Sequence, residues 1–256
     1  MIQISPHQVT PQLRSLFDPG APASLRCFAV LDGNAAGQIW ADTLSSPTWG
    51  IVREAAFGSL YFGGAPDAHT ISHVIADLAK NGDVLVGLWP EDERWGTLPP
   101  DPDYVGATLE FTGRPIGRGL HALLGPMPEG CQLRRIDRGL VQRFLKPDFY
   151  VSAFGSIEQA LEQGFGLCLM RGGEVLSEAF AGPSANGMIE LGTGTREPHR
   201  GRGYATLTCA HLIRECEKRG FRTYWNCAKQ NPASAALARK LGYRTEKEYK
   251  LVAWLR

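Results

Sequence analysis

The residues most clearly arranged for chemistry lie in the segment REPHRGRGYA, residues 196–205. Arg200 and Arg202 alternate there with Gly201 and Gly203, and an apolar-periodic helix is predicted to follow. The first N–H groups of a helix lack intrahelical partners and carry partial positive charge, which attracts anions. Glycines let an anion approach these groups, and arginines add charge-assisted hydrogen bonds to phosphate oxygens. The segment therefore predicts a phosphate site, most simply for a pyrophosphate.

Two better-known phosphate motifs do not fit this segment. The chain has no G-x-x-x-x-G-K-[ST] sequence, so a nucleoside-triphosphate loop is excluded. Gly201 and Gly203 are followed by Thr206, where a dinucleotide-binding motif would carry a third small residue. The pyrophosphate must then belong to another kind of ligand.

The elements that position this loop alternate between strands and helices. Residues 146–155 are expected to form a loop, and Ser156 with Gln159 resembles a capping box that begins a helix ending at Gly164. Three β-like segments joined by tight turns, ending in MIELGTGT (188–195), predict an antiparallel meander. The helix after the loop carries one apolar stripe, formed by Ala205, Cys209, Leu212, Ile213 and Cys216. A strand, a helix capped by Asn231 and a last strand follow. This order predicts an α/β or α+β fold with helices packed on a sheet.

A cluster of helix and strand breakers at residues 125–130 suggests a boundary between two parts, 1–125 and 126–256. Residues 57–90 repeat the strand, loop, helix and strand order of residues 188–227. Their loop has Asp67 where the later loop has arginines, so it should not hold an anion in the same way. We expect the first part to be a degenerate copy or an accessory domain.

Composition narrows the classes of partner. The chain has 256 residues, 43% hydrophobic and 21% charged, and a net charge of +1. This charge argues against nucleic acid or an anionic membrane as a partner. We find no signal peptide or long apolar run and expect a cytoplasmic protein without a membrane span, with a homo-oligomer left open. The cysteines lack C-x-x-C spacing and predict buried, reduced thiols: Cys27, Cys131, Cys168, Cys209, Cys216 and Cys227.

The loop resembles a signature of the GNAT superfamily of acyl-CoA N-acyltransferases, Q/R-x-x-G-x-G/A. The matching residues are Arg200, Gly201, Arg202, Gly203, Tyr204 and Ala205. In that family the loop wraps the pyrophosphate of acetyl-CoA. The strand before it resembles the splayed strand that pairs with the pantetheine arm, here near Thr193 and Thr195. Downstream, NPASAALARKLGY resembles a second family element that begins at Asn231 and includes Ser234.

The resemblance implies a GNAT fold, a mostly antiparallel mixed sheet flanked by helices, and transfer of an acetyl group to a primary amine. Since an ammonium must lose a proton before attack, a base is needed, and Glu190 on the splayed strand is our candidate. A hydrogen-bonded structural role for Glu190 is the alternative. The near-neutral charge favours a small-molecule acceptor. The family's acceptor segment would fall at about residues 146–155, where Asp148 or Tyr150 could meet an amine.

Two positions depart from the family pattern, Ala238 and Ser234, and Ser234 stands where an alanine is usual. Ala238 stands where a tyrosine often protonates the leaving thiolate, so that acid is absent, and Tyr204, Ser234, Cys227 or water could replace it. The same change keeps open a non-enzymatic acyl-CoA sensor or binding module. The signature also matches residues 114–119, but Gly125 and Pro126 would stop a helix there, and we interpret this match as chance.

A metal site is not expected. His69 and His73 are four residues apart on a predicted helix, but the glutamate of H-E-x-x-H is missing and no third ligand is near.

Overall fold

The computed structural model describes residues 1–114 and 119–256, and it divides into two compact units. Unit 1 comprises Met1–Glu110, Ala228–Gln230 and Lys247–Arg256. Unit 2 comprises Phe111–Cys227 and Asn231–Glu246. The last residues of the chain therefore pack with the first unit. Whether the parts 1–125 and 126–256 have the roles expected from the sequence stays a prediction.

Unit 1 is built on a sheet with the strand order β1-β2-β3-β4-β5-β12. All neighbours in it are antiparallel except β4 and β5, which are parallel and joined by helix α3. Its elements are β1 (Ile2–Ile4), η1 (Pro6–Gln8), α1 (Pro11–Ser15), α2 (Ser24–Leu31), β2 (Gly37–Ala41), β3 (Trp49–Glu54), β4 (Ser59–Gly64), α3 (Ala68–Ala79), β5 (Val84–Leu88) and η2 (Glu93–Thr97). Strands β6 (Tyr104–Thr112) and β12 (Thr245–Trp254) contain residues of both units.

Unit 2 repeats this plan with the strand order β7-β8-β9-β10-β11. Its first three pairings are antiparallel, and β10 and β11 are parallel and joined by helix α8. Its elements are α4 (Leu120–Leu123), β7 (Cys131–Arg135), α5 (Arg138–Val141), α6 (Pro147–Phe154), α7 (Ile157–Gln163), β8 (Phe165–Arg171), β9 (Glu174–Ala185), β10 (Met188–Thr195), η3 (Glu197–His199), α8 (Tyr204–Lys218), β11 (Arg222–Ala228) and α9 (Pro232–Lys240).

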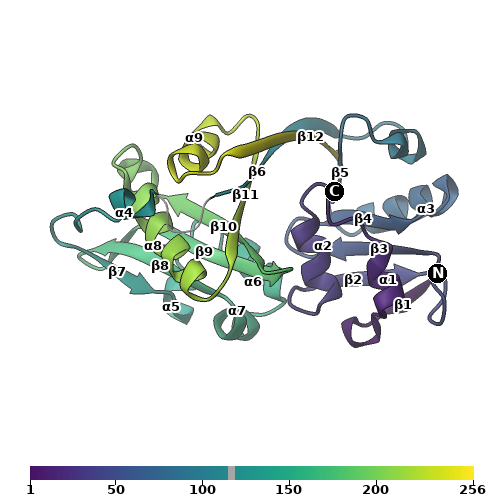
Figure 1. Cartoon of the computed structure of the whole chain (residues 1–256), viewed down its shortest axis with the longest axis horizontal. Coiled ribbons are helices and arrows are strands. Elements are labelled where there is room, and N and C mark those ends of the chain that lie inside the picture. Colours follow the sequence, from purple (N-terminus) through teal and green to yellow (C-terminus); the bar gives the residue numbers. More distant parts are fainter. Residues whose placement is uncertain (115–118) are drawn as a thin grey trace. The chain divides into compact units, whose positions relative to one another are not determined.

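Helices cover both faces of the unit 2 sheet (Figure 1). Cys168 and Met170 of β8 pack in one apolar cluster with residues of α5, α6 and α7. Leu169, between them, packs in another cluster with Tyr204 and Leu207 of α8. Because successive strand residues point to opposite faces, α5–α7 and α8 lie on opposite sides of the sheet. The expected α/β fold with helices on a mostly antiparallel sheet is confirmed.

The sequence predicts helix α7 of unit 2 correctly and does not predict helix α6. The Ser156 side chain accepts a hydrogen bond from Gln159 N–H and begins α7, and the helix stops before Gly164, as predicted. The segment 146–155 was expected to be a loop and is instead helix α6. Pro147 occupies its first turn and Gly155 ends it in the left-handed region, so both residues delimit a helix here.

The glycines of the LGTGT segment in β10 make room for side chains of β9. A Cβ atom at Gly192 would lie 2.2 Å from Cε2 of Phe180. The Phe180 ring in turn packs against Phe144 and Tyr150 on the α5–α6 side. Side-chain size at position 192 is therefore limited by the core beneath it.

We expect Gly192→Ala to lower the free energy of unfolding by about 1–3 kcal/mol, because the added methyl group would displace the Phe180 ring. Urea denaturation monitored by circular dichroism measures this change. Gly182→Ala is the matched control in β9, since a Cβ there meets its nearest atom at 3.6 Å. Equal stability of the two variants would show that the ring can move without cost.

Candidate functional site

Strands β10 and β11 separate partway along their length, and we call this feature the β10–β11 fork. Their parallel pairing covers Met188–Glu190 of β10 and stops at the rung between Glu190 and Tyr224. The antiparallel pairing of β10 with β9 continues to Thr195 and contains a register shift between Ile189 and Leu191. Within the described chain, residues 191–195 thus have no ladder with β11. An extended ligand could use this edge as a strand would.

The fork leads into the glycine-arginine loop and the beginning of α8. Gly201 and Gly203 have φ angles of 74° and 80°, in the left-handed region that favours glycine. A Cβ atom at either position would meet nothing within 4 Å, so the loop is bounded by open space. Gly203 caps α8 without a side-chain hydrogen bond, which leaves the N–H groups of the first turn for another acceptor. The structure therefore has the uncapped helix N-terminus and open glycine loop on which the predicted phosphate site depends, and binding of an anion stays a prediction.

The basic side chains around the loop divide into two groups. Arg196 turns back and donates from Nε to the carbonyl of Val175 at 2.9 Å and from its terminal nitrogen to the carbonyl of Arg143. Arg200 donates from Nε to the carbonyl of Thr195 at 3.2 Å, which ties the loop to the end of β10. Arg200 and Arg202 are exposed. These two remain available to a ligand at the surface, whereas Arg196 is structural.

The turn between β8 and β9 supports the loop from the other side. Arg171 donates to the hydroxyl of Tyr204 at 3.1 Å, and Nε2 of His199 lies 3.0 Å from a carboxylate oxygen of Glu174. The hydrogen bond with His199 lowers the pKa of Glu174. Tyr204 is buried, so it anchors the helix, and the following Ala205 is half-buried.

The predicted threonines of β10 direct their hydroxyls toward β9. Thr193 Oγ1 donates to the carbonyl of Glu178 at 2.8 Å, and Thr195 Oγ1 lies 2.9 Å from Oγ of Ser177. These bonds hold β10 against β9 along the residues of β10 that do not pair with β11. Any contact with a ligand in the fork would then come from the backbone of these residues.

The second sequence element forms the start of α9. Asn231 accepts a hydrogen bond from Ser234 N–H at 3.1 Å and caps the helix, as predicted. Ser234 Oγ accepts from the indole of Trp225 at 3.1 Å, so this hydroxyl is bound to β11. Ala238 is fully buried within the helix packing. Tyr150 of α6 is also buried and donates to the carbonyl of Ala160, so its hydroxyl is occupied in the core.

Glu190 lies at the base of the fork, on the last rung opposite Tyr224. Its side chain is half-buried. Asn226, two residues further along β11, donates to the hydroxyl of Tyr224 at 3.1 Å. The structure thus brings the predicted carboxylate beside two polar groups of β11 that the sequence analysis did not select.

A second carboxylate, Glu178 of β9, was missed by the sequence analysis. It is 2% exposed and accepts a hydrogen bond at Oε1 from the N–H of Leu145 at 2.7 Å. Its Oε2 is buried and has no partner among the described residues. Burial raises the pKa of Glu178. No motif surrounds it in EVLSEAFAG, which has only the pattern of a buried strand.

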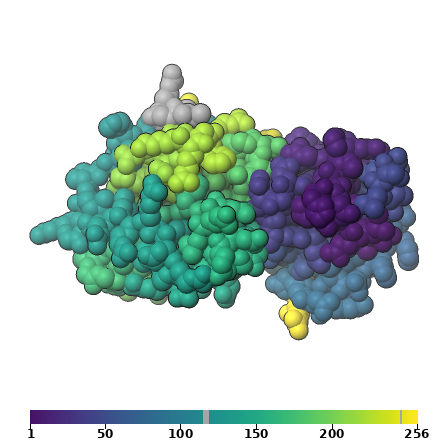
Figure 2. All heavy atoms as spheres, turned by 90° about the horizontal axis from the view of Figure 1, so that it is seen from below, coloured from purple at the N-terminus to yellow at the C-terminus, as the bar shows by residue number. Residues whose placement is uncertain are grey.

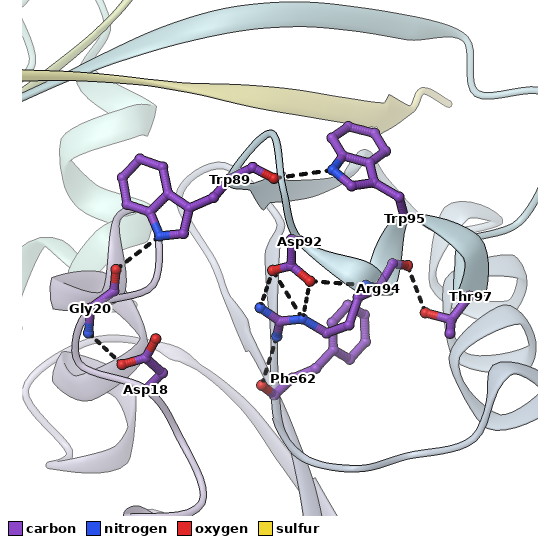
Figure 3. Close-up of polar contacts among 8 residues, drawn as sticks. All are labelled: Asp18, Gly20, Phe62, Trp89, Asp92, Arg94, Trp95 and Thr97. Carbon is purple, nitrogen blue, oxygen red and sulfur yellow. Dashed lines mark hydrogen bonds and ion pairs between the residues drawn. The ribbon is translucent and has the colours of Figure 1, made fainter.

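Unit 1 contains the corresponding β4–β5 fork, where Arg94 binds a backbone carbonyl of β4 (Figure 3). The ladder between β4 and β5 covers only Ser59 and Leu60. Beyond it, Arg94 donates to the carbonyl of Phe62 at 3.4 Å, and Gly64 N–H donates to the carbonyl of Leu16 at 3.0 Å.

Asp92 fixes the guanidinium of Arg94, with a distance of 2.9 Å from Nε to Oδ1. The nearby indoles of Trp89 and Trp95 donate to the carbonyls of Gly20 and Trp89. Backbone groups of this fork are therefore already bound within the chain.

In unit 1 the N-terminus of α3, the helix between the two parallel strands, is capped by a side chain of the protein. Asp67 caps α3 by accepting the Thr70 N–H at 2.7 Å, whereas Gly203 leaves α8 without a side-chain cap. A carboxylate at this place repels an anion. The order strand, loop, helix and strand is thus present in both units, and the helix lacks a side-chain cap in the second.

Other features add no further chemistry to this site. All six cysteines are free thiols, five of them buried, with Cys131 half-buried. Over residues 1–114 and 119–256, no cluster of three metal-ligating side chains is present, and His69 stacks on His73. No helix in the same ranges is long and apolar enough to span a membrane. The chance motif match at 114–119 falls largely outside the described residues, while Arg114 itself forms an ion pair with Glu217.

Comparison with known proteins identifies the fold and its relatives. A family model of the GNAT acetyltransferases matches residues 22–252, across both units. An uncharacterized N-acetyltransferase of Bacillus subtilis, YdfB, is 31% identical over 125 residues, which are 48% of this chain and 48% of YdfB. The chain therefore matches about half the length of that curated relative.

Two solved structures extend the similarity to the whole fold. A GCN5-related N-acetyltransferase-like protein from Streptococcus suis has a TM-score of 0.72 and 24% identity, covering 99% of this chain and 100% of its own. A tandem GNAT protein from the clavulanic acid biosynthesis pathway has a TM-score of 0.59 and 11% identity, covering 98% and 94%. Both similarities concern the fold and include both units.

The raised pKa of Glu178 predicts a pH-dependent stability. The pKa of Glu178 is higher in the folded protein than its value of about 4.3 in the unfolded chain. The protonated side chain therefore stabilises the fold below about pH 4.3, and this stabilisation is lost as the pH rises through the folded pKa. Arg196 opposes the shift, and the thiol of Cys168 on β8, with a pKa of about 12, does not titrate in this range. We expect Glu178→Gln to gain melting temperature relative to the parent as pH rises from about 4 to about 8.

Differential scanning calorimetry across this range measures the difference between the two proteins. A difference that stays constant with pH would contradict the raised pKa.

Proposed function

Because the chain belongs to the GNAT acetyltransferase family, we propose that it transfers the acetyl group of acetyl-CoA to a primary amine of a small molecule. Enzymes of this family use acetyl-CoA as co-substrate and act on acceptor substrates. The observation that carries the proposal is the β10–β11 fork, whose unpaired edge leads directly to the uncapped N-terminus of α8. This combination suits a ligand with an extended amide-containing arm and a pyrophosphate.

The loop residues have distinct roles in the proposal. N–H groups at the start of α8 bind the pyrophosphate, and Gly201 and Gly203 leave the space that it needs. Arg200 and Arg202 supply the charge, and Arg200 also fixes the loop to Thr195. The backbone of residues 191–195 pairs with the pantetheine arm. In unit 1 the helix that follows the opened strand, α3, is capped by Asp67, and Arg94 and Leu16 bind the β4–β5 fork, so we propose one acetyl-CoA site per chain.

The reaction needs a proton acceptor for the amine. An alkylammonium of pKa about 10.4 must lose a proton before its nitrogen attacks the thioester carbon. The new C–N bond forms, the C–S bond breaks and the electrons of that bond leave with the thiolate. We assign the acceptance of the proton to Glu190, directly or through water, because it lies at the base of the fork.

The leaving thiolate has no tyrosine at position 238 to protonate it. The hydroxyl of Ser234 accepts a hydrogen bond from Trp225, and that of Tyr204 accepts one from Arg171. Both hydroxyls are therefore engaged within the protein. A thiol of pKa about 8.5 leaves tolerably well as an anion, so turnover does not require this acid. Ala238 does favour a second candidate, an acyl-CoA sensor without turnover. Release of CoA thiol in the presence of primary amines separates the two functions.

We expect the double variant Arg200→Ala/Arg202→Ala to bind CoA more than about tenfold more weakly, because each charge-assisted hydrogen bond is worth about 1.5–3 kcal/mol. Isothermal titration calorimetry measures the affinity. The matched control is Arg134→Ala/Arg138→Ala, which removes two exposed arginines of unit 2 that pair with Asp137 and Glu158. Parent-like affinity in the folded loop variant would overturn the assignment of the loop.

The role of Glu190 leads to a separate test. Glu190→Gln should reduce kcat at least about tenfold near neutral pH while the affinity for CoA stays unchanged, because general-base catalysis contributes about 10²–10⁴-fold. Steady-state kinetics from about pH 6 to pH 10 also test whether the loss shrinks as the amine deprotonates by itself. A variant with the parent's kcat at every pH would remove Glu190 from the mechanism.

A further inference from the structure

We propose that Glu178 binds the ammonium group of the acceptor amine through its unpartnered carboxylate oxygen. The proposal rests on the proposed function, since it names the group that recognises the acceptor. It assigns to β9 a binding residue that the sequence pattern does not show.

The hydrogen bonds of Glu178 are incomplete. Oε1 accepts the N–H of Leu145, and Oε2 is buried with no partner within the described chain. The closest candidate cation, Arg196, uses its guanidinium on the carbonyls of Val175 and Arg143. A carboxylate accepts hydrogen bonds only and prefers a cationic donor, so an ammonium group has the matching chemistry.

Another buried glutamate in the same chain shows what a structural carboxylate looks like. Glu54 of β3 is 4% exposed and accepts hydrogen bonds from the N–H groups of Ala56, Phe57 and Ser59. These bonds complete the turn between β3 and β4, and both oxygens are used. Glu178 is buried as deeply and receives a single bond, so a role in supporting the fold explains it less well.

An incompletely bonded charge in a protein interior is costly, and such a group requires an explanation. Phe180 on the same strand belongs to an apolar cluster, the thiol of Cys168 lies on the paired residue of β8, and Arg196 also acts on the carboxylate. A leucine there would avoid the cost, and a glutamine would remove the charge. Retention of the carboxylate is explained if a ligand completes its hydrogen bonds during the reaction.

The position of Glu178 agrees with binding of the acceptor. It is paired with Gly194 of β10, and a Cβ at Gly194 would lie 2.8 Å from Glu178 Oε1 and 2.9 Å from Cδ1 of Leu145. The carboxylate is therefore beside the unpaired length of β10 and beneath the connection between α5 and α6. Helices α5–α7 form an outer face of unit 2, seen in teal to green in Figure 2.

The exposed side chain of Leu145 lies beside the point of β10 that Glu178 contacts. Leu145 is 43% exposed and contacts the same point of β10 as the carboxylate. Exposed side chains change rotamer within picoseconds to nanoseconds. The proposal requires that rotation of the Leu145 side chain uncovers the carboxylate, and the backbone N–H that donates to Oε1 need not move for this.

The experiment compares Glu178→Gln with the parent in the full chain. The probes are putrescine, ethanolamine, tyramine and kanamycin, each with acetyl-CoA, and CoA release is followed as thiol. For every probe that the parent acetylates, we expect KM for the amine to rise at least about tenfold, as for loss of one charged hydrogen bond. KM for acetyl-CoA should stay the same, and the melting temperature of the ligand-free variant at neutral pH should rise.

Glu54→Gln is the matched control, and we expect it to lower the melting temperature and leave KM for the amine unchanged. An unchanged amine KM in Glu178→Gln, or a lower melting temperature as in Glu54→Gln, would overturn the proposal, because Glu178 would then be structural. If the parent acetylates none of these amines, the proposed function fails for them, and the inference that depends on it fails with it. A parent that turns over beside an unaffected Glu178→Gln variant refutes the inference alone.

Discussion

The end of the ladder between β10 and β11 is the constraint on which the rest of unit 2 depends. After the rung at Glu190 and Tyr224, β10 keeps only its pairing with β9. Backbone groups in a sheet must be paired or exposed to a partner. The threonine hydroxyls, the Arg200 bond to Thr195 and the packing of Phe180 against Gly192 hold the single-sided strand in place. The result is an edge that is held from the β9 side and has no ladder with β11 among the described residues.

The two units share one order of strands and helices but differ in the hydrogen bonds at the fork and at the helix that follows it. Both have antiparallel strands followed by a parallel pair that is joined by a helix and separates early. In unit 1 the opened edge is bound by Arg94 and by the Leu16 carbonyl, and Asp67 caps the helix. In unit 2 Arg200 and Ser177 donate to the carbonyls of Thr195 and Gly194, but α8 begins without a side-chain cap. A ligand site is lost when the chain supplies its own hydrogen bonds.

Sequence reasoning succeeded where local chemistry decides structure. Ser156 and Gly164 delimit α7, and the glycines at 201 and 203 predicted an uncapped helix N-terminus, because these effects depend on a few neighbouring residues. The sequence does not predict α6, because the proline at its start and the glycine at its end are also typical of loops. Glu178 could not be found, since its missing partner depends on the register of β9 against β10 and on the position of Leu145. Such contacts are tertiary and leave no local pattern.

Amide hydrogen exchange with and without acetyl-CoA tests the central claim, that the β10–β11 fork is the open one. The account predicts slower exchange in peptides covering residues 191–195 and 201–205, because the ligand would pair with these N–H groups. Exchange in residues 61–64 of the filled β4–β5 fork should not change. Protection of residues 61–64, or no protection of residues 191–195 at saturating acetyl-CoA, would contradict it.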